Sequence, residues 1–189
     1  TVTDAAAATS AKTFTLTVVP DPLCEYANAT SVTVGQTVNG TLAAGDCLIS
    51  GKYTDQYELT LASATNVQVE LTGNPLDTYL RLLNRATSAV VAFNDDDALT
   101  GNYNSRINVP LAAGAYIIQA TSFATGATGA YRLRVCNSAP STIALGQTLS
   151  GTLETTDCGL AALGDGSFID RWQFTLALPM IVTLTQTSA

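Results

Sequence analysis

The sequence predicts an all-β protein built as an antiparallel β-sandwich, and three observations support this prediction. β-Branched residues dominate the composition, whereas the strong helix formers Glu, Lys and Met are scarce. Apolar and polar residues alternate with a period of two over much of the chain. These short segments are separated by turn residues every 8–12 residues or so, roughly the spacing that is typical of sandwiches.

The expected strands follow one another along the chain and are bounded by Gly, Pro and Asn residues, which interrupt strands. Examples of these boundaries are Gly35, Gly45, Gly73-Asn74-Pro75 and Gly126. The expected strands are residues 13–19, 31–34, 36–42, 55–61, 65–72, 77–83, 88–93, 105–109, 114–121, 129–136, 147–153, 170–176 and 180–187.

The composition excludes several classes of function. The chain has no histidine, so Ser-His-Asp and Cys-His catalysis and imidazole zinc sites are excluded. Its net charge is −7 and its eight basic residues are scattered, so we expect no nucleic-acid partner. No apolar run reaches the ~18 residues that span a bilayer, so we expect no membrane insertion. We expect a protein that is not an enzyme.

The four cysteines predict two structural disulfides, Cys24–Cys47 and Cys136–Cys158. The paired residues are 23 and 22 positions apart. The sequence contains no C-x-x-C pair, which would have suggested a metal site. Disulfides form in oxidising compartments, so we expect a secreted protein, extracellular or at the cell surface. Free thiols are the alternative.

An internal repeat predicts the domain organisation. Residues 34–42 recur as residues 145–153, and both stretches lead into an Asp-Cys pair, Asp46-Cys47 and Asp157-Cys158. Residues 53–61 recur as 168–176, and residues 13–18 resemble 130–135. A repeat of this length indicates tandem domains. We therefore expect a complete sandwich over 21–136, the first half of a second sandwich over 137–189, and the terminal strand of a preceding domain over 1–20.

A succession of motifs resembles the bacterial pre-peptidase C-terminal domain. The motifs are Gly35-Gln36-Thr37, Gly40-Thr41-Leu42, Asp55-Gln56-Tyr57, Asp77-Thr78-Tyr79-Leu80-Arg81-Leu82, Asn94-Asp95-Asp96, Gly114-Ala115-Tyr116 and Gly129-Ala130-Tyr131-Arg132-Leu133. The resemblance covers about residues 29–136, with a truncated second copy over 141–187. It implies a jelly-roll-like sandwich that accompanies secreted peptidases or belongs to large surface proteins, and whose relatives include collagen-binding modules, some stabilised by calcium. Residues 1–18 resemble the tail of a bacterial immunoglobulin-like domain.

The acidic run after the expected strand 88–93 is a candidate calcium site. Its residues are Asn94, Asp95, Asp96 and Asp97, and Asp77 opens a neighbouring strand. Ca²⁺ prefers such oxygen ligands, and adjacent carboxylates repel one another unless they are neutralised. Carboxylates that accept N–H groups of a turn are the alternative. Ca²⁺ is the only cofactor that the sequence suggests.

Aromatic side chains are candidate contacts for a ligand. Tyr53, Tyr103 and Phe123, with Tyr79 as a fourth, are expected on the surface, where aromatic rings bind partner proteins or glycans. Asp55 and Asp170 occupy matching repeat positions, and we expect structural carboxylates there, since neither has a second carboxyl group suited to glycosidase chemistry.

Two functions remain open. The first is a non-catalytic extracellular structural or adhesive module, which self-associates or packs against neighbouring domains of the same polypeptide. In this hypothesis the strand at 11–19 of one chain adds to the half-sandwich of the next, and the chains form a head-to-tail filament. The alternative is an accessory domain of a secreted bacterial peptidase that binds an extracellular matrix protein of the collagen type or a polysaccharide.

Overall fold

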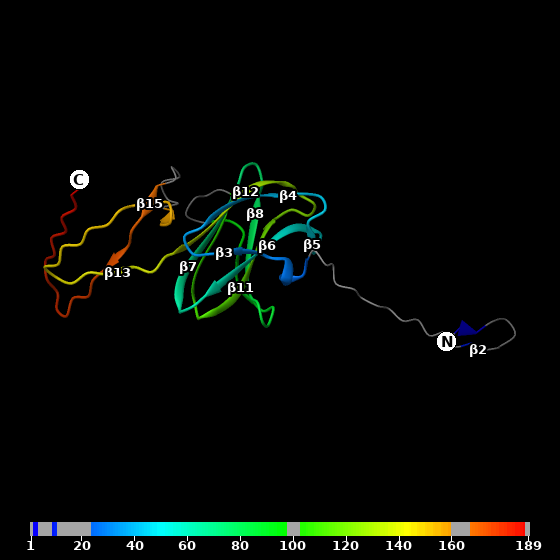
Figure 1. Cartoon of the computed structure of the whole chain (residues 1–189), viewed down its shortest axis with the longest axis horizontal. Coiled ribbons are helices and arrows are strands. Elements are labelled where there is room, and N and C mark those ends of the chain that lie inside the picture. The colour runs from blue at the N-terminus through cyan, green and yellow to red at the C-terminus, as the bar shows by residue number, and fades with distance from the viewer. Residues whose placement is uncertain (1, 4–8, 11–23, 98–102, 160–166, 188–189) are drawn as a thin grey trace.

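The computed structural model describes residues 2–3, 9–10, 24–97, 103–159 and 167–187. Two β-sheets pack face to face as a sandwich in the middle of the molecule (Figure 1). The predicted all-β sandwich is therefore confirmed. The described part of the chain contains no helix of the length and apolarity that a membrane crossing requires.

The two sheets are mostly antiparallel. The four-stranded sheet has the order β10 (Ser105–Leu111), β7 (Thr65–Gly73), β12 (Gly129–Asn137) and β4 (Thr37–Leu42). The six-stranded sheet has the order β3 (Thr30–Val32), β6 (Lys52–Leu61), β11 (Gly114–Ser122), β8 (Thr78–Asn84) and β9 (Val90–Asn94), and β5 (Cys47–Ile49) pairs with β6. Within this sheet β3 runs parallel to β6.

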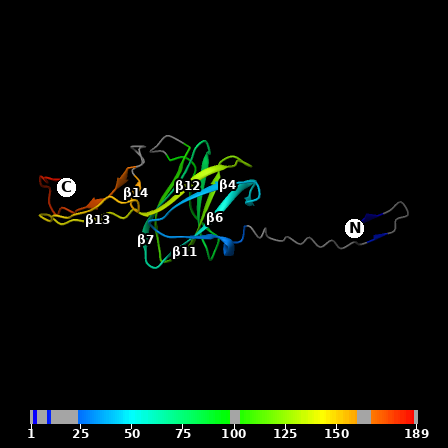
Figure 2. The same cartoon turned by 45° about the horizontal axis from the view of Figure 1, so that its top comes forward.

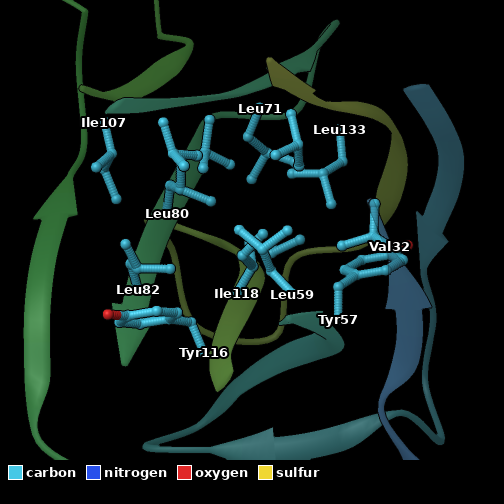
Figure 3. Packing of buried hydrophobic residues seen from close by; sticks show 14 of the residues in the cluster. Val32, Tyr57, Leu59, Leu71, Leu80, Leu82, Ile107, Tyr116, Ile118 and Leu133 are labelled. Atoms are coloured by element: carbon cyan, nitrogen blue, oxygen red, sulfur yellow. The ribbon is translucent and has the colours of Figure 1, made fainter. Parts of the chain in front are cut away.

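The core lies between the inner faces of the two sheets. On β6 the alternate residues Tyr57, Leu59 and Leu61 point inward and are at most 6% exposed. They meet inward residues of the other strands, such as Leu71 and Leu133, as Figure 3 shows. Burial of each such side chain stabilises the fold by about 1.5–3 kcal/mol. The period-two alternation therefore determines which face of each strand packs into the core of the sandwich.

The strands of the sandwich fall where the alternation predicts them, with two additions. β5, which is only three residues long, was not predicted, and β6 begins three residues before the predicted start. A two-residue pair, β1 (Val2–Thr3) and β2 (Thr9–Ser10), was also not expected. The predicted strand 13–19 lies outside the described residues.

The region 141–187 extends from one end of the sandwich (Figures 1 and 2). Its described residues, 141–159 and 167–187, form four two-residue strands: β13 (Ser141–Thr142), β14 (Cys158–Gly159), β15 (Phe168–Ile169) and β16 (Trp172–Gln173). The predicted strands 147–153 and 180–187 were wrong, and of 170–176 only β16 is formed. A strand needs a neighbouring strand as its hydrogen-bond partner. Residues 148–153 correspond to β4, which pairs with β12, and the described residues contain no strand equivalent to β12 beside 148–153.

Both predicted disulfides are present. Cys24 is bonded to Cys47, and Cys136 to Cys158, with Cα–Cα distances of 4.8 and 5.3 Å. The first holds the segment that contains the 3-10 helix η2 (Tyr26–Asn28) against the six-stranded sheet, where the Gln56 side-chain amide also donates to the Cys24 carbonyl at 3.1 Å. Two disulfides indicate an oxidising location, outside the cell or in a periplasm.

Candidate functional site

Three carboxylates converge at one end of the six-stranded sheet. Asp77 immediately precedes β8, and Asp95 and Asp96 immediately follow β9. Since β8 and β9 are antiparallel neighbours, the start of one meets the end of the other. One oxygen atom from each of the three side chains lies within 4.8 Å of the others. This is the spacing of ligands around a single cation.

The electrostatics of this cluster are unfavourable without a cation. Asp77 Oδ1 and Asp95 Oδ1 are buried, and neither has a hydrogen-bond partner. Burial raises the pKa of Asp77 and of Asp95, and the charge of Asp96 raises both further. Lys52 opposes these effects on both carboxyl groups but does not cancel them. Bound Ca²⁺ would supply the missing partner to both oxygen atoms.

Buried hydroxyl groups hold the backbone around the cluster. Ser105 Oγ donates to the Asp95 carbonyl at 2.7 Å and lies 2.9 Å from Thr78 Oγ1. The Phe123 N–H donates to the Asp77 carbonyl at 3.0 Å. Because Thr78 and Ser105 are at most 2% exposed, the positions of the two aspartates are fixed by the sandwich itself.

Asn94 and Asp97, the other two residues of the predicted calcium site, have partners outside the three carboxylate groups. Asn94 Oδ1 accepts the backbone N–H of Arg106 at 2.8 Å, and its amide nitrogen donates to the Asp96 carbonyl at 3.2 Å. Asp97 pairs instead with the Arg106 guanidinium at 3.2 Å. The candidate ligands are therefore Asp77, Asp95 and Asp96, and the other two residues shape the loop.

An aromatic surface adjoins the acidic cluster. We use this name for Lys52, Tyr79, Phe93 and Phe123. The Lys52 ammonium lies 4.6 Å from the Tyr79 ring centroid and 5.2 Å from that of Phe123. Phe93 stands 6.2 Å from Tyr79, and its side chain is 64% exposed. Exposed apolar rings grouped around a cation form a surface suited to binding a ligand.

Two of the four predicted aromatic contacts belong to this surface, Phe123 at 54% exposure and Tyr79. Tyr53 is half-buried and packs against the core, because it shares the inward face of β6 with Tyr57. Tyr103 is 68% exposed but makes none of the ring contacts that define the surface.

Asp55 joins the two sheets instead of forming a catalytic pair. Its carboxylate accepts the hydroxyl of Tyr131 at 2.5 Å, and the Tyr57 hydroxyl lies 2.6 Å from that of Tyr131. Tyr131 lies on β12 of the four-stranded sheet, and the other two on β6 of the six-stranded sheet. Burial raises the pKa of Asp55, although the hydrogen bond from Tyr131 opposes this shift. The carboxylate predicted to be structural therefore bonds a tyrosine across the sandwich.

Residues 53–122 match the family model of the bacterial pre-peptidase C-terminal domain. The matched region runs from β6 to the end of β11 and includes all three clustered aspartates. A search of curated protein sequences finds no significant match.

Several solved structures are similar to the sandwich. The pre-peptidase C-terminal domain of collagenase from Bacillus anthracis is 20% identical, with a TM-score of 0.48 over 57% of this chain and 94% of that one. PliG, a periplasmic lysozyme inhibitor of g-type lysozyme, matches in its Aeromonas hydrophila form at 19% identity, with a TM-score of 0.39 over 57% of this chain and 96% of that one. The Salmonella Typhimurium PliG has 15% identity and a TM-score of 0.35 over 57% and 98%. At these identities the likeness concerns the fold alone.

Proposed function

We propose that this chain is a non-catalytic binding module of an extracellular protein, and that it binds a polymeric ligand at the end of its six-stranded sheet. In this proposal Asp77, Asp95 and Asp96 hold a structural Ca²⁺ and the aromatic surface contacts the ligand. The observation that carries the proposal is the adjacency of the two features: Phe123 donates its N–H to the Asp77 carbonyl, and the Lys52 charge acts on both Asp77 and Asp95.

The chemistry of the surface favours a polymer with flat apolar faces. Aromatic rings stack on sugar rings and on the proline rings of collagen-like chains, and Tyr and Phe are enriched in binding interfaces. Lys52 adds a positive charge to a chain whose net charge is −7. A cation held beside the rings would keep the loop after β9 in one conformation, so less entropy is lost on binding. This mode of action fits the accessory domain of a secreted peptidase.

We expect alanine replacement of Tyr79, Phe93 and Phe123 together to weaken binding to the ligand at least tenfold, since about 1 kcal/mol or more is lost for each anchoring ring. The measurement is retention of the full chain on immobilised collagen and on a panel of insoluble polysaccharides. Tyr103→Ala is the matched control, because Tyr103 is exposed but lies outside the aromatic surface. Retention that falls equally with Tyr103→Ala, or that is unaffected by the triple variant, would refute the assignment of this surface.

Head-to-tail self-association is a second candidate function, and one observation favours it. Several large apolar side chains of the region 141–187 are exposed, among them Leu178 at 71%, Ile181 at 98% and Leu184 at 74%. Apolar surface of this kind marks a contact with another part of the polypeptide or with a second copy. Sedimentation velocity distinguishes the two functions: a concentration-dependent series of oligomers supports self-association, and a single monomeric species contradicts it.

A further inference from the structure

The two copies of the sequence repeat have the same local geometry. In the first, the Ala43 N–H donates to the Asp46 carboxylate at 2.6 Å, and in the second the Glu154 N–H donates to the Asp157 carboxylate at 2.6 Å. A second hydrogen bond closes each turn, because the backbone N–H of Asp46 donates to the Ala43 carbonyl and that of Asp157 donates to the Glu154 carbonyl. Asp46 and Asp157 therefore form equivalent turns in front of the second cysteine of each disulfide.

Strand pairing follows the same equivalence. Cys47 of β5 lies opposite Thr54 in an antiparallel pair, and Cys158 of β14 lies opposite Ile169, the residue that matches Thr54 in the repeat. β3 runs parallel to β6, and β13 runs parallel to β16 in the matching register. The short strands of 141–173 thus reproduce the first strands of the sandwich, which supports a second unit beginning there.

The Cys136–Cys158 disulfide crosses the junction between these units. Cys136 belongs to β12, the last strand of the sandwich, whereas Cys158 belongs to the copy that follows. Cys24–Cys47 holds the corresponding place before the first copy. Each disulfide therefore joins the Asp-Cys turn of a unit to the chain that leads into that unit.

Arg134 makes a second connection across the junction. Its side chain points outward from β12, on the face opposite Leu133, and yet it is only 6% exposed. Its guanidinium donates to the carbonyls of Thr155 (3.0 Å) and Asp157 and lies 4.5 Å from the ring centroid of Phe168. These contacts come from the turn and from β15 of the following copy.

The sheet beneath Arg134 supplies negative charge. Glu70, on the outward face of β7, is 7% exposed; burial lowers the pKa of Arg134, and the charge of Glu70 opposes this shift. Glu70 also pairs with the Arg106 guanidinium at 3.1 Å and accepts the Gln68 amide at 2.8 Å. A Cβ atom at Gly159 would lie 3.3 Å from the Glu70 carboxylate, so the following copy packs directly on this polar network. Charged side chains are seldom buried without partners. The segment that covers this outer face of the four-stranded sheet therefore has to supply hydrogen-bond partners, as the turn carbonyls do for Arg134.

We propose that the part of the outer face of the four-stranded sheet around Arg134 and Glu70 is a docking surface for the next repeat unit, which the Arg134 contacts and the Cys136–Cys158 disulfide hold in one fixed orientation. The kind of partner that fits is the Asp-Cys turn of a following unit, as found at residues 154–159. Successive units then form a stiff array, in which the six-stranded sheet is left for ligands. This inference is independent of the proposed ligand and of Ca²⁺.

Hydrogen–deuterium exchange on the full chain tests the docking surface. We expect Arg134→Gln and Phe168→Ala each to increase the exchange rate of residues 153–159 about tenfold or more, since the first removes charge-assisted hydrogen bonds to the turn and the second removes a cation–π contact. The double variant Cys136→Ser with Cys158→Ser should raise it further. Arg132→Gln is the matched control, because Arg132 lies on the same strand but is exposed.

The exchange of β7 and β11 shows whether the sandwich stays folded in each variant. Should Arg134→Gln unfold it, Phe168→Ala decides the outcome, because Phe168 lies outside the core of the sandwich. Unchanged protection of 153–159 in Phe168→Ala, or an equal increase in Arg132→Gln, would overturn the proposal.

Discussion

Gly40→Ala is expected to lower the free energy of unfolding of the sandwich by about 3 kcal/mol, which corresponds to a fall in Tm of about 10 °C. Gly40 lies on β4 directly opposite Tyr131 of β12. A Cβ atom there would lie 2.8 Å from Tyr131 Cε1 and closer still to Cζ and to the hydroxyl oxygen. The ring would have to move, and it is 4% exposed and packed in the core.

Moving the Tyr131 ring would also break the hydrogen bonds between the sheets. The Asp55 carboxylate would lose the hydroxyl that it accepts, and a half-buried carboxylate without its partner costs roughly 1–3 kcal/mol. The effect of the added methyl group is thus amplified by the tyrosine that it displaces. Thermal unfolding measured by circular dichroism is the direct test.

The repeat supplies a matched control for this prediction. Gly151 is the counterpart of Gly40, and a Cβ atom there would lie 3.0 Å from Asp170 Oδ2, an oxygen of an exposed side chain that can turn away. Gly151→Ala should therefore change the free energy of unfolding by less than about 0.5 kcal/mol. Equal effects of the two substitutions would show that Tyr131 tolerates displacement.

Strand positions were predictable because they depend on local alternation. Within a single strand, the alternate apolar residues Tyr57, Leu59 and Leu61 predict which face points inward. The same periodicity predicts that Tyr53 points inward as well. The disulfides were predictable because their spacing recurs in the repeat. β5 was not, since three residues are too few to show a period.

The candidate site was predictable only in part, because it depends on contacts between strands. The acidic run was found, but adjacency in sequence suggested that its members act together. Asp95 and Asp96 meet Asp77 at the shared end of β8 and β9, whereas Asp97 pairs with Arg106 of β10. The bond between Asp55 and Tyr131 joins residues 76 positions apart in different sheets, so no local pattern could reveal it.

Calcium is expected to raise the Tm of the wild-type chain by roughly 10 °C at a concentration 100 times the Kd, because binding to the folded state alone then contributes about 2.7 kcal/mol. Chelation should reverse the shift. Asp95→Asn combined with Asp96→Asn removes two of the three candidate ligands and should abolish the response. Glu25→Gln, which removes an exposed carboxylate outside the cluster, should leave it intact. A wild-type Tm that is the same with calcium and with chelator would contradict the site.

The dependence on pH separates a calcium site from an ordinary acidic loop. Burial and the charge of Asp96 raise the pKa of Asp77 and Asp95 above the ordinary 3.8, so without calcium the folded state binds more protons than the unfolded state just above that pH. The contribution of the cluster to stability is then present at low pH and is lost as the pH rises through the folded-state pKa values. With calcium the sign is reversed, because protons compete with the ion for the same oxygen atoms.

Urea unfolding of the wild-type chain between pH 4 and pH 7 tests this difference. On acidification the free energy of unfolding should rise in chelator and fall in calcium, and both trends should weaken in Asp95→Asn. A slope of the same sign in both buffers would indicate carboxylates that bind no ion.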